Sequence, residues 1–387
     1  MTLGCRLNIA ESEHIRAMLG SSDIVVVNSC AVTNEAVAAT RAAIRRARRA
    51  RPMSELVVTG CAAEIDPAGF AAMPEVTRVV GNLAKLAPAH WPKPVAAPVF
   101  RDHARAFVEV QNGCDHSCTF CAIPAGRGPA RSIGAGAVID RIASLVDAGH
   151  REVVLTGVDL TSYGGDLPGT PTLGALVERI LRHVPALERL RLSSLDSIEI
   201  DERLFALLTG EPRVMPHVHL SLQAGDDMIL KRMKRRHSRT QSVALVERLK
   251  AARADIAIGA DLIAGFPTED EAMFANTRAL IDDCDIVHAH VFPFSPRSTT
   301  PAARMPQLPA PEVKRRAAAL RGKAAERRAR WLSTLVGTRQ SVLVERPGTN
   351  GHAGNFAPVR LPSRATGTVQ TLTIADFDGT NLIGTPQ

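Results

Sequence analysis

Between residues 105 and 295 the chain repeats one pattern, a short strand-like run followed by a helical stretch. Such runs, separated by helices, are typical of parallel strands joined by crossover helices. Six runs fit the pattern: AFVEV (106–110), EVVLTG (152–157), RLRLSS (189–194), HVHLSL (217–222), AIGADLIAG (257–265) and DIVHAHVF (285–292). A full barrel of this kind has eight units, so we expect a (βα)6 partial TIM barrel with its site at the carboxyl ends of the strands.

Residues 1–85 carry the same alternation on a smaller scale. The strand-like runs are DIVVVNSC (23–30), ELVVTGC (55–61) and VTRVVGN (76–82), and a helix with an arginine-rich face is expected over residues 34–51. This order predicts an N-terminal parallel-sheet, flavodoxin-like domain and places the whole chain in the α/β class.

Composition suggests the other boundaries. Residues 86–100 contain four prolines, which favours a linker because proline blocks helix and ladder hydrogen bonds. A long basic helix is expected at 311–337, at the end of a barrel domain that spans residues 101–335. Short strands and many glycines over residues 336–387 predict a small all-β module.

Three of the seven cysteines, Cys114, Cys118 and Cys121, stand in the segment NGCDHSCTFC directly after the first barrel strand. A structural zinc site usually has four ligands, and here only His116 could supply a fourth. A [4Fe-4S] cluster is normally held by four thiolates, so three would leave one iron open for an outside ligand. The spacing therefore favours an iron–sulfur cluster at the barrel mouth, with zinc as the alternative.

The cysteines of residues 1–85 fall at the ends of strand-like runs. Cys30 and Cys61 each follow a run directly, and parallel strands end at the same sheet edge, where α/β proteins place ligands. Cys5, in TLGCRLN, is expected in another strand-end loop. We therefore expect a second set of three thiolates, although single buried cysteines are common. Cys284 has no companion cysteine, which favours a structural role.

Composition also bounds the setting in which the chain works. An odd number of cysteines disfavours a disulfide framework and favours metal or redox chemistry. The first residues do not resemble a signal peptide and no apolar run is long enough to span a bilayer, so we expect a cytoplasmic protein without membrane attachment. The net charge of +8 is compatible with nucleic-acid binding, whereas 4% aromatic residues disfavour binding by base stacking.

Two arginine-rich helices are candidates for phosphate contact. Six arginines lie within residues 41–51, and a second basic stretch covers residues 314–330. Lysine and arginine bind phosphates without reading sequence, but a solvated helix face has the same composition. Both interpretations stay open at this point.

Taken together, five segments resemble the methylthiotransferase family of the radical S-adenosylmethionine superfamily. They are TLGCRLNIAESE (2–13), VVVNSCAVTNEA (25–36), VVTGCAAE (57–64), NGCDHSCTFCAIPAGRG (112–128) and SLQAGDDMILKRMKRRH (221–237). The C-terminal stretch resembles the RNA-binding TRAM module. GCRLN, NSCAVTNEA, LTGVDLTSYG and GADLIAGFPTE resemble the branch that methylthiolates threonylcarbamoyladenosine at position 37 of tRNA.

The resemblance implies two [4Fe-4S] clusters and S-adenosylmethionine as cofactors. The cluster on Cys114, Cys118 and Cys121 would chelate S-adenosylmethionine through its open iron and generate a 5′-deoxyadenosyl radical. The cluster on the other three cysteines would carry the sulfur, and a second S-adenosylmethionine would supply the methyl group. The implied partners are the tRNA anticodon loop, an electron donor such as a flavodoxin or ferredoxin, and a sulfur donor.

The resemblance also suggests residues that contact S-adenosylmethionine. Phe120 would pack by the adenine, and the backbone at Thr156 and Gly157 would meet the methionyl amino group. The remaining candidates lie at or after barrel strands: Ser193, Ser194 and Gln223 for ribose or carboxylate, Arg236 for the carboxylate, and Gly265 for the adenosyl part. An ordinary glycine turn and a solvated helix charge are the alternatives at Gly157 and Arg236.

Three other functions remain alternatives. The same chemistry could act on isopentenyladenosine in tRNA or on an aspartate of a ribosomal protein. The chain could also be a non-enzymatic iron–sulfur protein that binds RNA. Two sets of three cysteines disfavour the last alternative, since a structural cluster needs no vacant iron.

Overall fold

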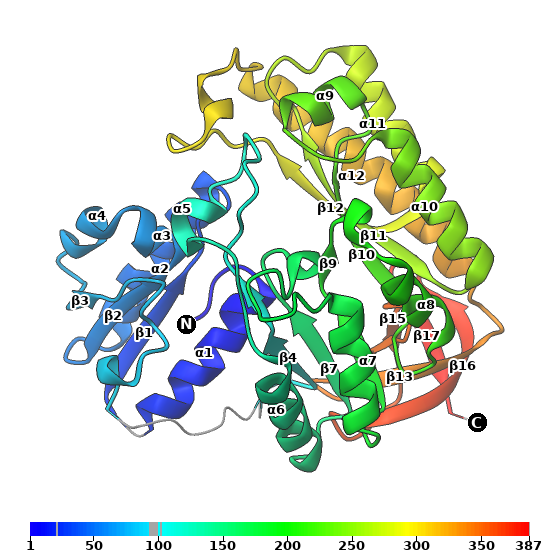
Figure 1. The fold of residues 1–387 in the computed structure, drawn as a ribbon, viewed down its shortest axis with the longest axis horizontal. Helices are drawn as coiled ribbons and strands as arrows, with labels where there is room; N and C mark the ends of the chain where they lie inside the picture. The colour runs from blue at the N-terminus through cyan, green and yellow to red at the C-terminus, as the bar shows by residue number, and fades with distance from the viewer. Residues whose placement is uncertain (21, 93–99, 101–102, 387) are drawn as a thin grey trace.

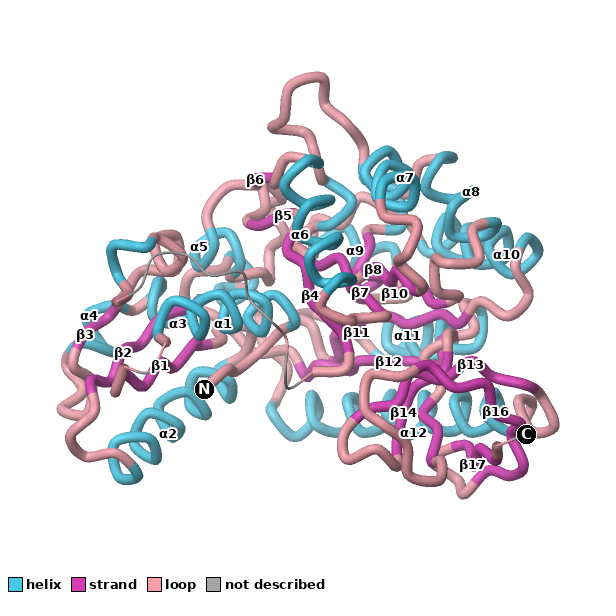
Figure 2. The backbone as a smooth tube through the Cα atoms, turned by 90° about the horizontal axis from the view of Figure 1, so that it is seen from below, coloured by secondary structure: helices cyan, strands magenta, loops and turns pink. Residues whose placement is uncertain are grey.

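The computed structural model describes residues 1–20, 22–92, 100 and 103–386. Residues 93–99 of the expected linker at 86–100 therefore lie outside the described residues, whereas residues 86–92, with a 3-10 helix η1 (Pro88–His90), and residue 100 are described. Figure 1 shows three parts in chain order: an N-terminal α/β layer, a central set of parallel strands with helices, and a C-terminal β-barrel. The first and last parts lie at opposite ends of the molecule in both views (Figure 2).

The N-terminal layer contains a parallel sheet in the order β1-β2-β3. Its elements are α1 (Arg6–Leu19), β1 (Ile24–Ser29), α2 (Asn34–Ala50), β2 (Glu55–Gly60), α3 (Cys61–Ile65), α4 (Pro67–Ala71) and β3 (Arg78–Val79). The Thr33 side chain caps α2 by accepting from the Ala36 amide at 3.2 Å. Before the first helix, Thr2 forms a parallel bridge with Asn28, so a single residue extends the sheet at that edge.

The central part contains the parallel strands expected from the sequence. They are β4 (Arg105–Glu109), β7 (Glu152–Thr156), β8 (Arg189–Leu192), β9 (Ser194–Leu195), β10 (His217–Gln223), β11 (Ala257–Ala264) and β12 (Ile286–Pro293). β4-β7-β8 form one sheet and β9-β10-β11-β12 the next, and one residue separates β8 from β9. Each of the six expected runs therefore becomes a strand, and the third run is divided between β8 and β9.

Helices alternate with these strands along the chain. The connecting elements are β5 (Gln111–Asn112), α5 (Ile123–Arg127), β6 (Arg131–Ser132), α6 (Ala135–Asp147), η2 (Leu160–Ser162), α7 (Leu173–His183), η3 (Ser197–Glu199), α8 (Glu202–Gly210), α9 (Asp227–Arg232), α10 (Arg239–Ala252), α11 (Glu271–Asp283), η4 (Pro301–Arg304) and α12 (Ala310–Ser333). α12 packs against β11 and β12, and α1 packs along β4. None of the described helices is both long and apolar enough to cross a bilayer.

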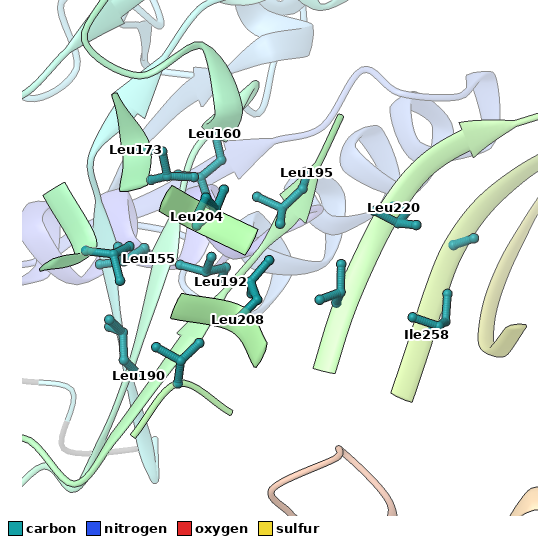
Figure 3. Packing of buried hydrophobic residues seen from close by; sticks show 14 of the residues in the cluster. Leu155, Leu160, Leu173, Leu190, Leu192, Leu195, Leu204, Leu208, Leu220 and Ile258 are labelled. Atoms are coloured by element: carbon teal, nitrogen blue, oxygen red, sulfur yellow. The ribbon is translucent and has the colours of Figure 1, made fainter. Parts of the chain in front are cut away.

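Strand residues alternate between an apolar helix-facing side and a polar inner side. On β8, Leu190 and Leu192 belong to the main hydrophobic core, where leucines of α7 and α8 meet them (Figure 3). Arg189 and Arg191 point the other way: the Arg191 Nε donates to the buried Glu152 Oε1 at 2.9 Å, and Arg189 forms an ion pair with the Glu152 Oε2 at 2.9 Å. The inner side of the strands is thus charged near its amino-terminal end.

The C-terminal part is a closed five-stranded barrel. Its strands are β13 (Arg339–Glu345), β14 (Asn350–Ala353), β15 (Pro358–Arg360), β16 (Val369–Phe377) and β17 (Leu382–Thr385), in the order β13-β14-β15-β17-β16. Val342, Leu372 and Ile374 fill its core together with Trp331 of α12. A small all-β module was predicted here, and the β-barrel is what the structure contains.

One aromatic residue joins this β-barrel to the floor of the central strands. The Phe356 ring lies 4.9 Å from the Arg191 Cζ and 5.2 Å from the Arg105 Cζ, and it stacks on His352 with ring centres 4.6 Å apart. Its φ of 69° is in the left-handed region that a bulky residue rarely adopts. The contacts made by the ring outweigh this local cost.

Replacing Phe356 with alanine should therefore lower the free energy of unfolding by about 2 kcal/mol, because a half-buried ring and its cation–π contacts are lost. Urea denaturation measures the change. Phe205→Ala is the matched control, since its ring is also half-buried but meets a single guanidinium, that of Arg248 at 4.6 Å, and joins no β-barrel. Equal losses in the two variants would show that Phe356 has no special role in joining the parts.

Candidate active site

The loop from Cys114 to Cys121 connects β5 to α5 at the carboxyl ends of the central strands. Gly113 begins the loop with a φ of 73°, and an added Cβ would lie 1.8 Å from a backbone carbonyl oxygen, so glycine is required. The backbone N–H of His116 donates to the Cys114 Sγ at 3.4 Å, and that of Ile123 donates to the Cys121 Sγ at 3.4 Å. The loop backbone thus positions two of the three thiols.

The surroundings of these thiols suit a charged ligand. Burial raises the pKa of Cys114 to about 12 and that of Cys121 to about 11. Metal ligation requires thiolates, so a bound metal would displace both protons. The guanidinium of Arg235 donates to the Cys118 Sγ at 3.6 Å and to the buried Asp196 Oδ2 at 2.9 Å. Asp196 therefore fixes a cation beside the thiol set.

Cys5, Cys30 and Cys61 lie at one edge of the N-terminal sheet. Ser29 and Gly60 are register partners at the ends of β1 and β2, which brings the next residues, Cys30 and Cys61, to neighbouring positions. Cys5 is the N-cap of α1, and a Cβ added to the preceding glycine would lie 2.9 Å from the Cys30 Sγ. Burial raises the pKa of both Cys30 and Cys61.

The two thiol sets are adjacent across the interface between the N-terminal layer and the barrel. A Cβ added to Gly126 of α5 would lie 3.1 Å from the Cys61 Cβ. The Asn82 amide donates to the Gly126 carbonyl oxygen at 2.5 Å and lies 3.8 Å from the Cys61 Sγ. Five residues after Cys121, the chain therefore packs directly against the other set.

A buried arginine strengthens this junction. Arg127 donates to both carboxylate oxygens of Glu11, at 2.9 and 3.1 Å, and to the side-chain oxygens of Asn8 and Asn112 at 2.5 and 2.9 Å. Lys85 forms a second ion pair with Glu11 at 2.5 Å. All of these side chains are buried, so the network fixes α1 against the loop that carries Cys114, Cys118 and Cys121.

These residues fit the cofactors better than they fit zinc. The seven cysteines all lie among the described residues and are free thiols, and Cys284 is buried outside both sets. His116, the fourth zinc ligand considered from the sequence, is held by Asp159 at 2.6 Å and by Arg236 at 3.0 Å. Within the described part of the chain, only the Cys114 thiol of the three lies in one possible ligand group with His116 and Asp159. Near Arg235, the buried Oγ of Ser193 has no hydrogen-bond partner among the described residues, as expected where a polar ligand docks.

Two family models match the chain. The radical SAM superfamily model covers residues 108–281, and the model described as uncharacterized protein family UPF0004 covers residues 1–81. The threonylcarbamoyladenosine tRNA methylthiotransferase MtaB of Rickettsia prowazekii (strain Madrid E) is 45% identical over 93% of this chain and 90% of its own length. The chain belongs to the MtaB family. Radical SAM enzymes of the MtaB family use S-adenosylmethionine and [4Fe-4S] clusters.

Other relatives give the range of the similarity. MtaB of Bacillus subtilis (strain 168) is 34% identical over 79% of this chain and 74% of its own length. The tRNA-2-methylthio-N(6)-dimethylallyladenosine synthase of Erythrobacter litoralis is 32% identical over 92% of this chain and 87% of its own length. The radical SAM methyltransferase TsrM from Kitasatospora setae superposes with a TM-score of 0.53 at 17% identity over 73% of this chain and 65% of its own, which supports the α/β radical SAM fold.

In this MtaB family member, the expected S-adenosylmethionine contacts fall into three groups. One group lies at strand ends around Asp196. Arg236 pairs with Asp196 at 3.1 Å and Glu199 at 2.8 Å, Ser193 is buried at the end of β8, and Ser194 pairs with β10. Their positions keep them as candidates, and because Arg236 is 42% exposed while two carboxylates hold it, both interpretations of this residue stay predictions.

A second group has local packing partners. The Thr156 carbonyl oxygen already accepts from the Val110 amide at 3.0 Å, and a Cβ on Gly157 would lie 3.0 Å from the Gln111 Oε1. At Gly265, φ is 72° and an added Cβ would lie 2.9 Å from a Val313 methyl of α12. Close approach of neighbouring groups therefore already accounts for both glycines.

Phe120 and Gln223 complete the expected set. Phe120 packs against the apolar cluster of α9 and β11, on the barrel side of the thiol loop. Gln223 ends β10 with a φ of 68°, an uncommon conformation outside glycine. Both side chains are half-buried, so both can still meet a ligand.

Sequence reasoning missed Arg235, Asp196, Arg127 and Glu11. Arg235 precedes the chosen Arg236 in the run KRMKRRH, and charge alone could not separate the two. Arg127 and Glu11 are 116 residues apart, and single buried charges without local partners carry no sequence signal. A glutamate within the segment RLNIAESE was the only visible hint.

The arginine-rich helices serve the fold more than expected. On α2, Arg48 donates to the carbonyl oxygens of Glu75 and Ser54 at 2.7 and 2.8 Å. On α12, Arg316 pairs with Glu269 at 2.9 Å and Arg327 pairs with Asp285. These three cations are held within the fold, whereas Arg45, Arg46, Arg49 and Arg51, in and next to α2, are exposed, so phosphate contact by that run stays a prediction.

Proposed function

We propose that this chain is a tRNA methylthiotransferase that converts N6-threonylcarbamoyladenosine at position 37 to its 2-methylthio derivative. The observation that carries the proposal is the 45% identity to MtaB of R. prowazekii over 93% of this chain and 90% of that protein. The arrangement of thiols supports it, because two sets of three lie on either side of one interface.

Each thiol set is proposed to hold one [4Fe-4S] cluster. Cys114, Cys118 and Cys121 would hold the cluster that binds S-adenosylmethionine, and Cys5, Cys30 and Cys61 would hold the second. When bound, these groups supply the radical chemistry, the sulfur and the methyl group that the reaction needs. The network of Arg127, Glu11 and the two asparagines keeps the two sets at a constant separation, which a reaction at one adenine carbon requires.

The chain's own polar groups are proposed to orient S-adenosylmethionine. Asp196 holds Arg235 beside Cys118, and the unpaired Ser193 Oγ offers a hydrogen bond at the same edge. The residues proposed from the sequence to contact S-adenosylmethionine are Phe120, Thr156, Gly157, Ser193, Ser194, Gln223, Arg236 and Gly265. The apolar cluster under Phe120 would exclude water from the nucleoside.

The rest of the chain is proposed to deliver the tRNA. We assign residues 1–85, 101–335 and 336–387 to three domains and the C-terminal β-barrel to a TRAM-like RNA-binding role. The anticodon loop is single-stranded at the target base, so the base can be splayed out without melting a duplex. An electron donor such as a flavodoxin or ferredoxin and a sulfur donor would complete the reaction in the cytoplasm.

Purified protein, reconstituted anaerobically with iron and sulfide, tests the proposal directly. With S-adenosylmethionine and a reductant, it should methylthiolate tRNA carrying threonylcarbamoyladenosine, detected by mass spectrometry of the nucleosides. Parallel reactions contain tRNA with isopentenyladenosine or purified ribosomes. Product from either of these, with none from the first tRNA, would contradict the proposal.

A further inference from the structure

The inner side of β10, β11 and β12 carries a polar cluster away from both thiol sets. The Asp261 Oδ1 accepts from the His219 Nε2 at 3.0 Å and from the His290 Nδ1 at 3.2 Å, and the two imidazoles lie 4.7 Å apart. The His219 side chain is 5% exposed, whereas that of His290 is 58% exposed. His290 is therefore the member of the cluster that faces open space.

Arg6 extends from the thiol set of Cys5, Cys30 and Cys61 to the inner side of these strands. It follows Cys5 at the start of α1, and its Cζ lies 5.9 Å from the centre of the Phe356 ring. Burial lowers the pKa of Arg6, and the nearby Arg191 lowers it further, whereas Asp261 raises it. Within the part of the chain that the structure describes, the Arg6 guanidinium makes no hydrogen bond and no ion pair. A half-buried cation without a hydrogen-bonded counter-charge is unusual, because an aromatic ring compensates only part of its desolvation.

The charges of this interior leave room for an anion. The guanidiniums of Arg6, Arg105, Arg189 and Arg191 face the carboxylates of Glu152, Asp261 and Glu345, and a further carboxylate near Arg189, that of Glu188, is already paired with Arg151. Arg189 and Arg191 also keep terminal N–H groups without a partner among the described residues. The excess cation is the unpaired one, Arg6.

We infer that Arg6, Asp261 and His290 form the subsite for the threonyl arm of the substrate nucleoside, Arg6 binding its carboxylate and the His290–Asp261 pair its hydroxyl group. This inference rests on the proposed function, which makes threonylcarbamoyladenosine the substrate. A threonylcarbamoyl group ends in a carboxylate and a hydroxyl, the two groups that an unpaired guanidinium and an exposed imidazole on a carboxylate recognise. An isopentenyl arm has neither group and would leave these residues desolvated and unpaired.

The position of Arg6 also couples the arm to the chemistry. Because Arg6 is covalently next to Cys5, a carboxylate held by Arg6 is held at a constant distance from the thiol set proposed to carry the sulfur. The guanidinium is thus a positioning and specificity group for the nucleoside.

The same His219–Asp261–His290 set could be taken for a divalent-metal site, since two imidazoles and a carboxylate are common ligands. The neighbouring guanidiniums are positively charged and would repel a metal cation at this position. Arg6 and Asp261 interact electrostatically, and Arg191 stands beside them. An anionic ligand is the better match to this surrounding charge.

The test compares binding of two anticodon stem-loops to the reconstituted holoenzyme by anaerobic fluorescence anisotropy. One carries threonylcarbamoyladenosine, and the other carries the same nucleoside with its carboxylate converted to the primary amide. The wild type should prefer the carboxylate by about 10- to 100-fold, the usual worth of one charged hydrogen-bonded pair. Arg6→Gln should bind both loops equally while keeping its iron content, and Arg6→Lys should restore part of the preference.

Arg16→Gln is the matched control, because Arg16 is on the same helix, 59% exposed, and pairs with Glu13 at 3.3 Å. It should retain the wild-type preference. His290→Phe should keep the preference for the carboxylate over the amide. It should lose the wild type's preference, of up to about 10-fold, for the threonyl arm over a glycyl arm, which lacks the hydroxyl. This variant provides a reading of the subsite even if Arg6→Gln fails to fold.

Three results would overturn the inference. The first is an Arg6→Gln protein that retains the full preference, and the second is a wild type without any preference. The third is one equivalent of zinc bound to the wild-type protein and absent from His290→Phe, as measured by elemental analysis. Methylthiolation of the unaltered stem-loop by wild type, assayed in parallel, separates these results from failure of the proposed function, in which no product forms at all.

Discussion

Replacing Cys118 with alanine should abolish cleavage of S-adenosylmethionine, whereas replacing Cys61 should leave cleavage intact and stop methylthiolation. Each substitution removes one of three thiolates from a different set. Cys118 lies beside Arg235 on the barrel loop, and Cys61 begins α3 on the N-terminal sheet. Because no side chain belongs to both sets, each loss should stay local.

Anaerobic assays for 5′-deoxyadenosine and for the methylthiolated nucleoside measure the two outcomes side by side. Cys284→Ala is the control, since burial raises the pKa of Cys284 to about 12 and it lies in the main core outside both sets. It should retain both activities. A folded Cys61→Ala protein that no longer cleaves S-adenosylmethionine would show that the two sets do not have separate roles.

Replacing Glu11 with glutamine should lower the free energy of unfolding by about 3–5 kcal/mol, because the substitution leaves two buried cations without their counter-charge. Glu11, Lys85 and Arg127 are each 1% exposed. Burial by itself would raise the pKa of Glu11, but Lys85 and Arg127 outweigh it and lower that pKa to about 2. An amide can accept hydrogen bonds but cannot neutralise either cation.

The pH dependence follows from the sign of this shift. The pKa of Glu11 is lower in the folded chain than its ordinary value of 4.5, so its stabilisation is complete above about pH 4.5 and is lost as the pH falls towards 2. Urea unfolding between pH 7 and pH 3 should show this loss in the wild type and a smaller loss in Glu11→Gln. Glu35→Gln, at an exposed position of α2, is the control and should change stability by less than about 0.5 kcal/mol. A neutral effect of Glu11→Gln would contradict the role given to this network.

The strands were predictable because each is a short apolar run with the right period. The pairing of Ser29 with Gly60 follows from two parallel strands of equal length, and it carries Cys30 and Cys61 to one edge. The third strand is shorter than expected, Arg78–Val79 in place of 76–82, since only the amides of Thr77 and Val80 extend its bonding to β2. The local sequence pattern predicts strands and the pairing of their ends, because neighbouring residues determine both.

Side-chain partners that lie far apart in the sequence could not be predicted from the local pattern. Arg235 donates to a thiol 117 residues away, and a choice between it and Arg236 needs the folded loop. The same holds for the arginines of α2, where Arg48 turns back to bind carbonyl oxygens of its own layer. Charge in a sequence shows that a cation is present, and only the fold shows which group holds it.

The proposed function requires that this chain adds the methylthio group to threonylcarbamoyladenosine in tRNA. Mass spectrometry of tRNA nucleosides from cells with and without the gene tests it most directly. Loss of the 2-methylthio form, with the unthiolated nucleoside accumulating, is the predicted result. An unchanged nucleoside profile would contradict the claim and would direct attention to the masses of ribosomal proteins.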